Sequence, residues 1–115
     1  MYLPKVIKYN AQVPEAAHRY GEIARFIGLE GSSDAQLVDA LIAELKAMNK
    51  ALNIPSCIKE YEGGIIDEQE FNDKLPSVAA LAIGDACTGS NPRQPSQQGM
   101  EKLLKACYYD LPIDF

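Results

Sequence analysis

Asp85-Ala86-Cys87-Thr88-Gly89-Ser90-Asn91-Pro92-Arg93 divides this sequence, because helical patterns precede it and one further helical pattern follows it. The stretch itself breaks the helical pattern with a glycine, a proline and small polar residues. Binding residues often lie on loops of this kind, which a rigid scaffold holds in place. We therefore interpret residues 85–93 as a functional loop on a helical scaffold.

The first half of the chain predicts two well-marked helices. Pro14 opens the first, where its missing amide costs nothing, and Gly28 is placed to end it in the left-handed conformation. Ser33 and Gln36 form a capping box for the second, which Pro55 should end by restricting the residue before it. The second helix has the longest amphipathic pattern in the chain, formed by Leu37, Val38, Leu41, Ile42, Leu45, Met48 and Leu52.

The second half predicts shorter helices. Asp67 begins one with an N-terminal capping signature, and Pro76 should divide that region into two helices. Residues 78–83 are apolar on nearly every side, so we expect that helix to be the most buried. Ser96 caps a last helix, and no strand pattern of useful length occurs. The sequence predicts one compact all-α domain, residues 1–115, with about five to seven helices.

Bulk composition excludes several classes of function. The net charge of -5 argues against nucleic acid, which requires a basic surface to neutralise phosphates. No apolar run approaches the roughly 20 residues that span a bilayer, so we expect no membrane segment. Cys57, Cys87 and Cys107 are odd in number and widely spaced, which favours free thiols over disulfides or zinc. These features indicate a cytoplasmic protein.

The residues alone indicate no metal site and no catalytic residue. His18 is the one histidine, and it faces away from the apolar stripe of its predicted helix, between Glu15 and Glu22. We interpret it as a solvated side chain rather than a ligand, because a metal site needs several ligands. Helix capping explains the carboxylates that follow Gly63-Gly64, which are Asp67, Glu68 and Glu70. The sequence has neither a GxGxxG nor a Walker motif.

Asp85 and Cys87 are the most informative residues of the loop. A carboxylate at a helix C-terminus is disfavoured by the helix dipole, so Asp85 should gain compensating bonds. We expect these from the amides of Thr88 and Gly89 or from Arg93, so that Asp85 fixes the shape of the loop. Unchanged stability and loop order in an Asp85→Ala variant would refute this hypothesis. The residues alone leave Cys87 open, and they favour a buried structural thiol over a functional one.

At this loop the chain resembles a known family, the iron-containing (group III) alcohol dehydrogenases, in their C-terminal part. It is similar to the alcohol dehydrogenase part of bifunctional aldehyde–alcohol dehydrogenases and to lactaldehyde reductase. The D-x-CTGxNPR loop, residues 85–93, is the most specific match. The other matching blocks are Leu3-Pro4-Lys5-Val6-Ile7-Lys8-Tyr9-Asn10 (LPxVIxYN), Tyr20-Gly21-Glu22-Ile23-Ala24 (YxxIA), Leu52-Asn53-Ile54-Pro55 with Ile58-Lys59-Glu60 (LxIPxxIKE) and Tyr108-Tyr109 (YY).

This resemblance implies an enzyme of two domains, of which this chain is the helical C-terminal one. The family's N-terminal domain is α/β and binds NAD(P), and its metal, usually iron, is held by one Asp and three His. All those ligands precede the block that begins here, so the resemblance implies a fragment that binds no cofactor and lacks its N-terminal partner domain. The implied reaction is reversible hydride transfer between NAD(P) and a small alcohol or aldehyde, with the metal polarising the substrate oxygen.

The resemblance also implies a role for Cys87, whose counterpart lines the substrate pocket near the nicotinamide. The remaining residues are implied to shape the loop rather than to catalyse, and they are Asp85, Thr88, Gly89, Asn91, Pro92 and Arg93. The chain departs from the family pattern at Lys5, where the family often has a non-ligand His, and in a slightly longer segment at residues 61–64.

Two functions therefore remain open from the sequence. The first is one wall of the substrate cleft of a metal-dependent alcohol dehydrogenase, inactive alone and prone to self-association through the face that its partner domain would cover. The alternative is a free-standing helical interaction module without catalysis. The substrate, the choice of NAD or NADP, the metal and the oligomeric state are not encoded in these residues.

Overall fold

The computed structural model describes residues 1–63 and 66–115, and their secondary structure is helical without strands. The sequence pattern Gly63-Gly64 predicts a loop, and Gly64 lies outside the described residues. The helices in chain order are α1 (Leu3–Asn10), α2 (Pro14–Phe26), α3 (Asp34–Ala51), the short 3-10 helix η1 (Ile58–Glu60), α4 (Glu68–Gly84), the short 3-10 helix η2 (Thr88–Ser90) and α5 (Gln97–Tyr109). The predicted all-α fold is confirmed.

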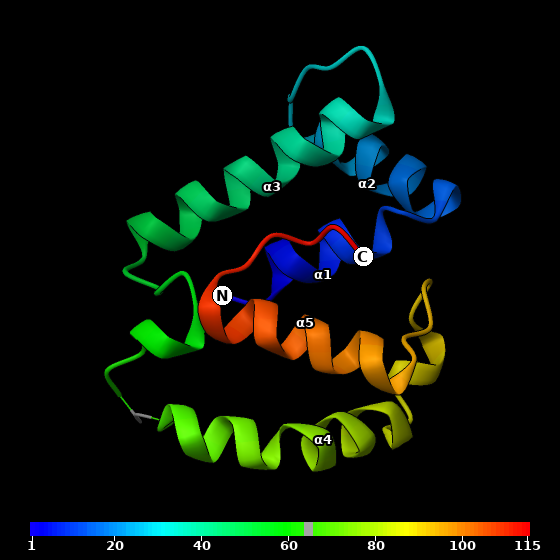
Figure 1. The fold of residues 1–115 in the computed structure, drawn as a ribbon. Helices are drawn as coiled ribbons and strands as arrows, with labels where there is room; N and C mark the ends of the chain where they lie inside the picture. Colours follow the sequence, from blue (N-terminus) through cyan, green and yellow to red (C-terminus); the bar gives the residue numbers. More distant parts are fainter. Residues whose placement is uncertain (64–65) are drawn as a thin grey trace.

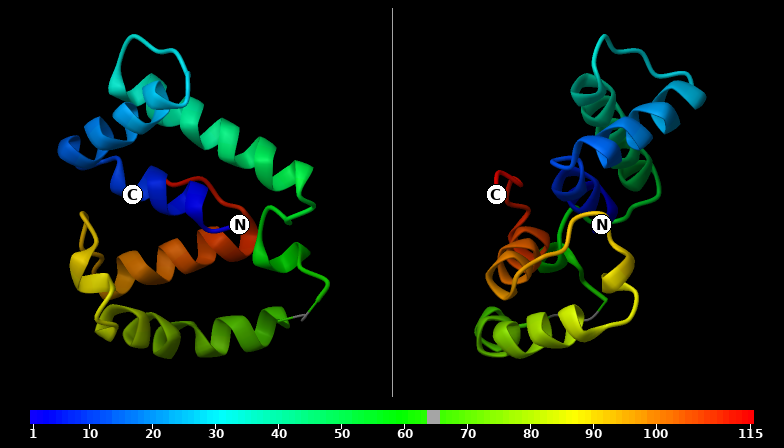
Figure 2. Two further views of the ribbon diagram at one scale, coloured as in Figure 1. Left: turned by 180° about the vertical axis from the view of Figure 1, so that it is seen from behind. Right: turned by 90° about the vertical axis from the view of Figure 1, so that its right-hand side faces the viewer.

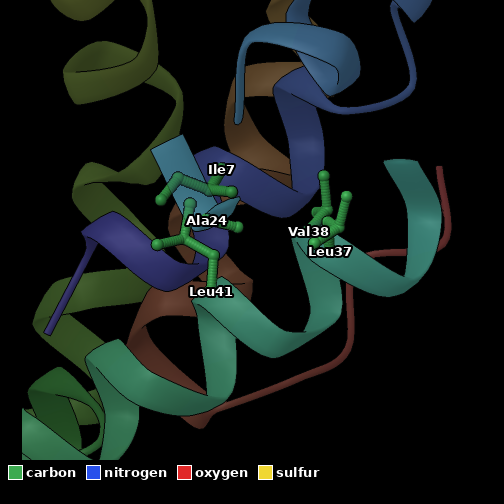
Figure 3. Close-up of a cluster of buried hydrophobic side chains, with 5 residues drawn as sticks. All are labelled: Ile7, Ala24, Leu37, Val38 and Leu41. Atoms are coloured by element: carbon green, nitrogen blue, oxygen red, sulfur yellow. The ribbon is translucent and has the colours of Figure 1, made fainter. Parts of the chain in front are cut away.

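The helices form layers, with α2 and α3 on one side, α1 in the middle, then α5, and α4 outermost (Figures 1 and 2). α1 lies between two buried clusters. Ile7 packs on one side with Ala24 of α2 and with α3 (Figure 3). Tyr9 packs on the other side with Ala106 of α5 and with Ile113. This burial on both sides explains how a helix of 8 residues persists although short helices are marginal alone.

The predicted helix starts are confirmed by hydrogen bonds at their caps. The side chain of Ser33 accepts from the amide of Gln36, and that of Asp67 accepts from the amide of Glu70. Ser96 caps α5 in the same way. The capping box of α3 differs in one detail, because Gln36 Oε1 accepts from the Ser32 amide at 2.8 Å.

Three helices end at a residue in the left-handed conformation. Gly28 does so after α2, as predicted, with φ +86°. Asn53 does so after α3 with φ 56°, and the Ile54 amide then donates to the Asn49 carbonyl at 2.8 Å. α3 therefore ends through its own cap, and Pro55 follows a helix that has already stopped. Asp110 ends α5 with φ 56°.

Two predictions for α4 are wrong. Pro76 does not divide the region, because α4 is continuous through it. Leu75 is buried just before Pro76 and Ala79 just after it, so packing on both sides offsets the missing hydrogen bond. Residues 78–83 are also not the most buried, since Leu81 is 76% exposed and Val78 45%. α4 is an outer layer that buries one face on α5 and leaves the other open.

A buried lysine joins α1 to the end of α5. Lys5 is 7% exposed, and its Nζ donates to the Leu111 carbonyl at 2.6 Å and pairs with Asp110 at 2.7 Å. Both partners therefore satisfy a charge that would otherwise be costly to bury. Cys107 lies nearby on α5, where burial raises the pKa of its thiol to about 11 although the charge of Lys5 acts to lower it.

The raised pKa of Cys107 makes a testable contribution to stability at high pH. The unfolded chain ionises this thiol near the ordinary value of 9.0, before the folded chain does. Its contribution is therefore complete below about pH 9 and is lost as the pH rises through about 11. We expect the free energy of unfolding of the wild type to fall by about 2 kcal/mol more than that of Cys107→Ala over this range. Parallel urea-unfolding profiles for the two proteins would contradict this expectation.

Candidate functional site

The loop of residues 85–93 begins where α4 ends, and its first turn is held by α4. Asp85 Oδ1 accepts from the Cys87 amide at 2.8 Å, which is an Asx-type turn. The Thr88 hydroxyl donates to the Ala82 carbonyl at 2.6 Å. The sequence suggested that the Asp85 carboxylate accepts from the amides of Thr88 and Gly89. The carboxylate accepts from the Cys87 amide instead, and the Thr88 amide donates to the main-chain carbonyl of Asp85 at 3.0 Å.

Arg93 does not pair with Asp85, and this alternative is corrected. Its Nη1 donates instead to the main-chain carbonyls of Tyr9, at 3.2 Å, and Phe115, at 2.8 Å. The guanidinium carbon lies 4.0 Å from the centroid of the Tyr9 ring, a cation–π distance. The far end of the loop is therefore attached to α1 and not to α4.

A reciprocal amide pair joins the same end of the loop to α1. Asn10 Nδ2 donates to Asn91 Oδ1 at 2.9 Å, and Asn91 Nδ2 donates to Asn10 Oδ1 at 2.8 Å. Asn91 Nδ2 also donates to the Arg93 carbonyl at 2.6 Å, and Asn10 Nδ2 lies 3.3 Å from the Tyr20 hydroxyl. Asn10 is 2% exposed, so these bonds satisfy an otherwise costly buried amide. Pro92 lies exposed between the two anchoring residues.

The side chain of Gln94, an exposed residue, bridges three carbonyls of the loop. Its Nε2 lies within 3.1 Å of the main-chain carbonyls of Thr88, Gly89 and Asn91. Neither Gln94 nor Asn10 was among the residues that sequence reasoning selected for the site. No local pattern marks them, because Asn10 meets a partner 81 positions away and the three acceptors of Gln94 are main-chain atoms.

This scaffold leaves Cys87 exposed, so the interpretation as a buried thiol is wrong, whereas Cys57 and Cys107 are buried. Two glycines flank it, Gly84 and Gly89, and neither has positive φ. Apart from the adjacent residues and, for Gly84, the backbone of its own helix, no atom of the described chain lies within 4 Å of a Cβ added at either glycine. Internal packing therefore does not account for the two missing side chains, and the backbone on both sides of Cys87 stays open to close approach.

The other residues that were considered as ligands have structural partners. His18 is exposed, with Nδ1 3.1 Å from Asp34 Oδ2 and Nε2 3.7 Å from Glu22 Oε1. Glu68 accepts from Lys59 at 3.0 Å and from the Tyr109 hydroxyl at 2.9 Å, and the first of these hydrogen bonds is the main cause that lowers its pKa. Among residues 1–63 and 66–115, no three His, Cys, Asp or Glu side chains are placed to hold a metal ion.

One cleft in the described part of the chain lies away from Cys87. It has a volume of about 810 Å³ and is formed by the start of α1, the end of α3 and the segment around η1, with Lys46, Lys50 and Tyr61 in its wall. No helix in this part of the chain combines the length and apolar character needed to cross a bilayer.

Comparisons with known proteins show which proteins this chain is similar to. The chain is 45% identical over 115 residues to the NADPH-dependent butanol dehydrogenase of Clostridium saccharobutylicum, covering 100% of this chain and 28% of that protein. It is 36% identical to aldehyde-alcohol dehydrogenase 2 of Entamoeba histolytica, covering 95% of this chain and 14% of that protein. It is 34% identical to the bifunctional aldehyde-alcohol dehydrogenase of Escherichia coli K12, covering 90% of this chain and 13% of that protein.

The chain thus spans 28% or less of the length of these relatives, and the family match covers nearly all of this chain. Residues 1–108 match the family described as "Fe-containing alcohol dehydrogenase family, C-terminal". The helical fold, the ordered blocks and this match lead to one conclusion: the chain belongs to the Fe-containing alcohol dehydrogenase family and corresponds to its C-terminal region.

Proposed function

We propose that this chain forms one wall of the substrate cleft of an alcohol dehydrogenase that transfers hydride between NAD(P) and a small alcohol or aldehyde. The observation that carries the proposal is the 45% identity to a butanol dehydrogenase over the whole chain. In this proposal the loop of residues 85–93 faces the substrate, and Cys87 is the side chain that contacts it. The exposure of Cys87 and the open backbone at Gly84 and Gly89 support that placement.

The chain's own residues do not fit a metal or a dinucleotide. In the part of the chain that the structure describes, no three His, Cys, Asp or Glu side chains are placed to hold a metal ion. The sequence also has no GxGxxG motif of the kind that binds a dinucleotide. The proposal therefore assigns iron and NAD(P) to a partner domain outside this chain. No step of the reaction is assigned to a metal held by these residues.

A chimera tests the proposal directly. Residues 1–115 would replace the matching region of the Clostridium saccharobutylicum butanol dehydrogenase. We expect the chimera to reduce butyraldehyde with NADPH, while this chain alone and the relative's remaining part alone show no turnover. Two results would contradict the proposal: a folded chimera that binds NADPH without turnover, and metal-dependent turnover by this chain alone.

A free-standing interaction module remains the alternative. Exposed apolar side chains distinguish this module from a part of an alcohol dehydrogenase. A chain that functions alone should carry polar residues where a partner domain would otherwise cover it. Leu3 and Leu81 are instead exposed, and Val78 lies beside Leu81 on the open face of α4. We therefore expect the purified chain to self-associate in sedimentation experiments at high concentration. Leu81→Glu should reduce that association, and a wild type that stays strictly monomeric would favour the module.

A further inference from the structure

The segment after α5, residues 110–115, runs back along α1 and is called the strap here (Figures 1 and 2). Lys5 holds its start through Asp110 and the Leu111 carbonyl. Ile113 is buried in the cluster with Tyr9 and Ala106, so the middle of the strap is fixed independently of the loop.

The end of the strap meets the loop at Arg93. The Phe115 carbonyl accepts from Arg93 Nη1 and, also at 2.8 Å, from Gln12 Nε2. The Phe115 ring lies 6.1 Å from the Tyr9 ring, so Tyr9 contacts both the strap and the guanidinium. Arg93 is thus enclosed between α1 and the strap.

A short chain of hydrogen bonds connects Arg93 to Cys87. Asn91 Nδ2 donates to the Arg93 carbonyl, and the Asn91 amide donates to the Thr88 carbonyl at 3.0 Å. The Ser90 amide and hydroxyl both donate to the Cys87 carbonyl, at 3.2 and 2.8 Å. η2 therefore links the strap side of the loop to the exposed thiol through these hydrogen bonds.

We propose that the strap is a positioning element for Cys87, and that it acts through Arg93. On its other side Cys87 is tied to α4 by the bonds of Asp85 and Thr88. If the strap no longer held Arg93, the loop would keep its ties to α4, while its attachment to α1 would depend on the Asn10–Asn91 pair. The placement of the thiol relative to α1 would then become variable. The consequence for a substrate rests on the proposed function, but the positioning itself does not.

Two variants test this role in the 115-residue chain. Arg93→Lys keeps the charge but loses the planar guanidinium that reaches two carbonyls. Deletion of Phe115 removes the acceptor on the strap. A trifluoromethyl label on Cys87 should give one ¹⁹F resonance in the wild type, since the other two thiols are buried and react slowly. We expect both variants to broaden or split that resonance, and amide exchange at residues 88–91 to accelerate about tenfold.

Matched controls separate positioning from a general loss of stability. Arg25→Lys changes an exposed arginine that pairs with Asp34, and it should leave the ¹⁹F signal unchanged. Leu41→Ala lowers stability from the opposite side of α1, and exchange should then rise in α2 and α3 rather than at residues 88–91 alone. The proposal is wrong if deletion of Phe115 leaves the wild-type resonance and loop exchange unchanged, or if exchange in both variants rises uniformly along the chain.

These readouts need no enzyme activity, so they separate the two proposals. If the two variants change the loop signals and the chimera is inactive, the strap role stands and the proposed function is overturned. If the chimera is active and the two variants leave the loop unchanged, the proposed function stands and the strap role is overturned.

Discussion

Leu37→Ala is expected to lower the free energy of unfolding by about 3 kcal/mol. Leu37 is 0% exposed and lies where α1, α2 and α3 meet, in the cluster with Ile7 and Ala24 (Figure 3). The close approach of Gly31 leaves little freedom for the surroundings to collapse, since a Cβ there would lie 3.0 Å from Leu37 Cγ. A loss of that size is a large part of the roughly 5–15 kcal/mol that stabilises a domain.

Leu52→Ala is the matched control on the same side of the molecule. Leu52 caps the end of α3 and is 62% exposed, so its truncation should change stability by less than about 0.5 kcal/mol. Urea unfolding followed by circular dichroism would measure both variants. Equal losses for Leu37→Ala and Leu52→Ala would contradict the placement of the core.

Asn10→Ala is expected to cost about 2 kcal/mol, because it leaves the Asn91 side chain without its reciprocal partner at a partly buried site. Asn91→Ala should cost a similar amount. If the two amides act as a pair, the double variant should lose less than the sum, with a coupling energy of about 1 kcal/mol.

Asn72→Ala serves as the control, because Asn72 also makes side-chain hydrogen bonds but lies exposed on α4. It should cost less than about 0.5 kcal/mol. Strictly additive losses for Asn10→Ala and Asn91→Ala would show that the amide pair does not attach the loop to α1.

Local chemistry made much of the fold predictable. A helix cap depends on residues within one turn, so Ser33, Asp67 and Ser96 marked helix starts correctly. Gly28 marked a helix end for the same reason, since a left-handed residue suits glycine. For α3, the sequence indicated Pro55 as the residue that ends the helix. Asn53 ends it instead, because asparagine can also adopt the left-handed conformation.

The predictions that failed depended on which layer a helix occupies. The apolar character of residues 78–83 does not reveal that α4 is an outer layer with one face on α5, so Leu81 was expected inside and is exposed. No local pattern indicates that Lys5 is buried, since Asp110 and the Leu111 carbonyl make its burial possible from the other end of the chain. Distant partners of this kind leave no periodic signal.

The sequence marked the loop of residues 85–93 as the candidate site, but it did not reveal the bonds that hold the loop. The blocks of the family resemblance meet in space, since Asn10 of the first block pairs with Asn91 of the loop and Tyr20 lies beside Asn10. Lys59 and Tyr109 likewise meet at Glu68. These block residues thus hold the scaffold together. Cys87, by contrast, is an exposed thiol in the loop.

The placement of Cys87 in the substrate cleft is the central claim, and thiol alkylation in the butanol dehydrogenase chimera tests it most directly. Mass spectrometry would follow the reaction of Cys87 with iodoacetamide, with and without NADPH and butanol, a pair that cannot exchange hydride. We predict that the bound pair slows alkylation at least about tenfold and that the alkylated chimera loses turnover. An alkylation rate unchanged by the pair, together with full turnover after alkylation, would contradict the claim.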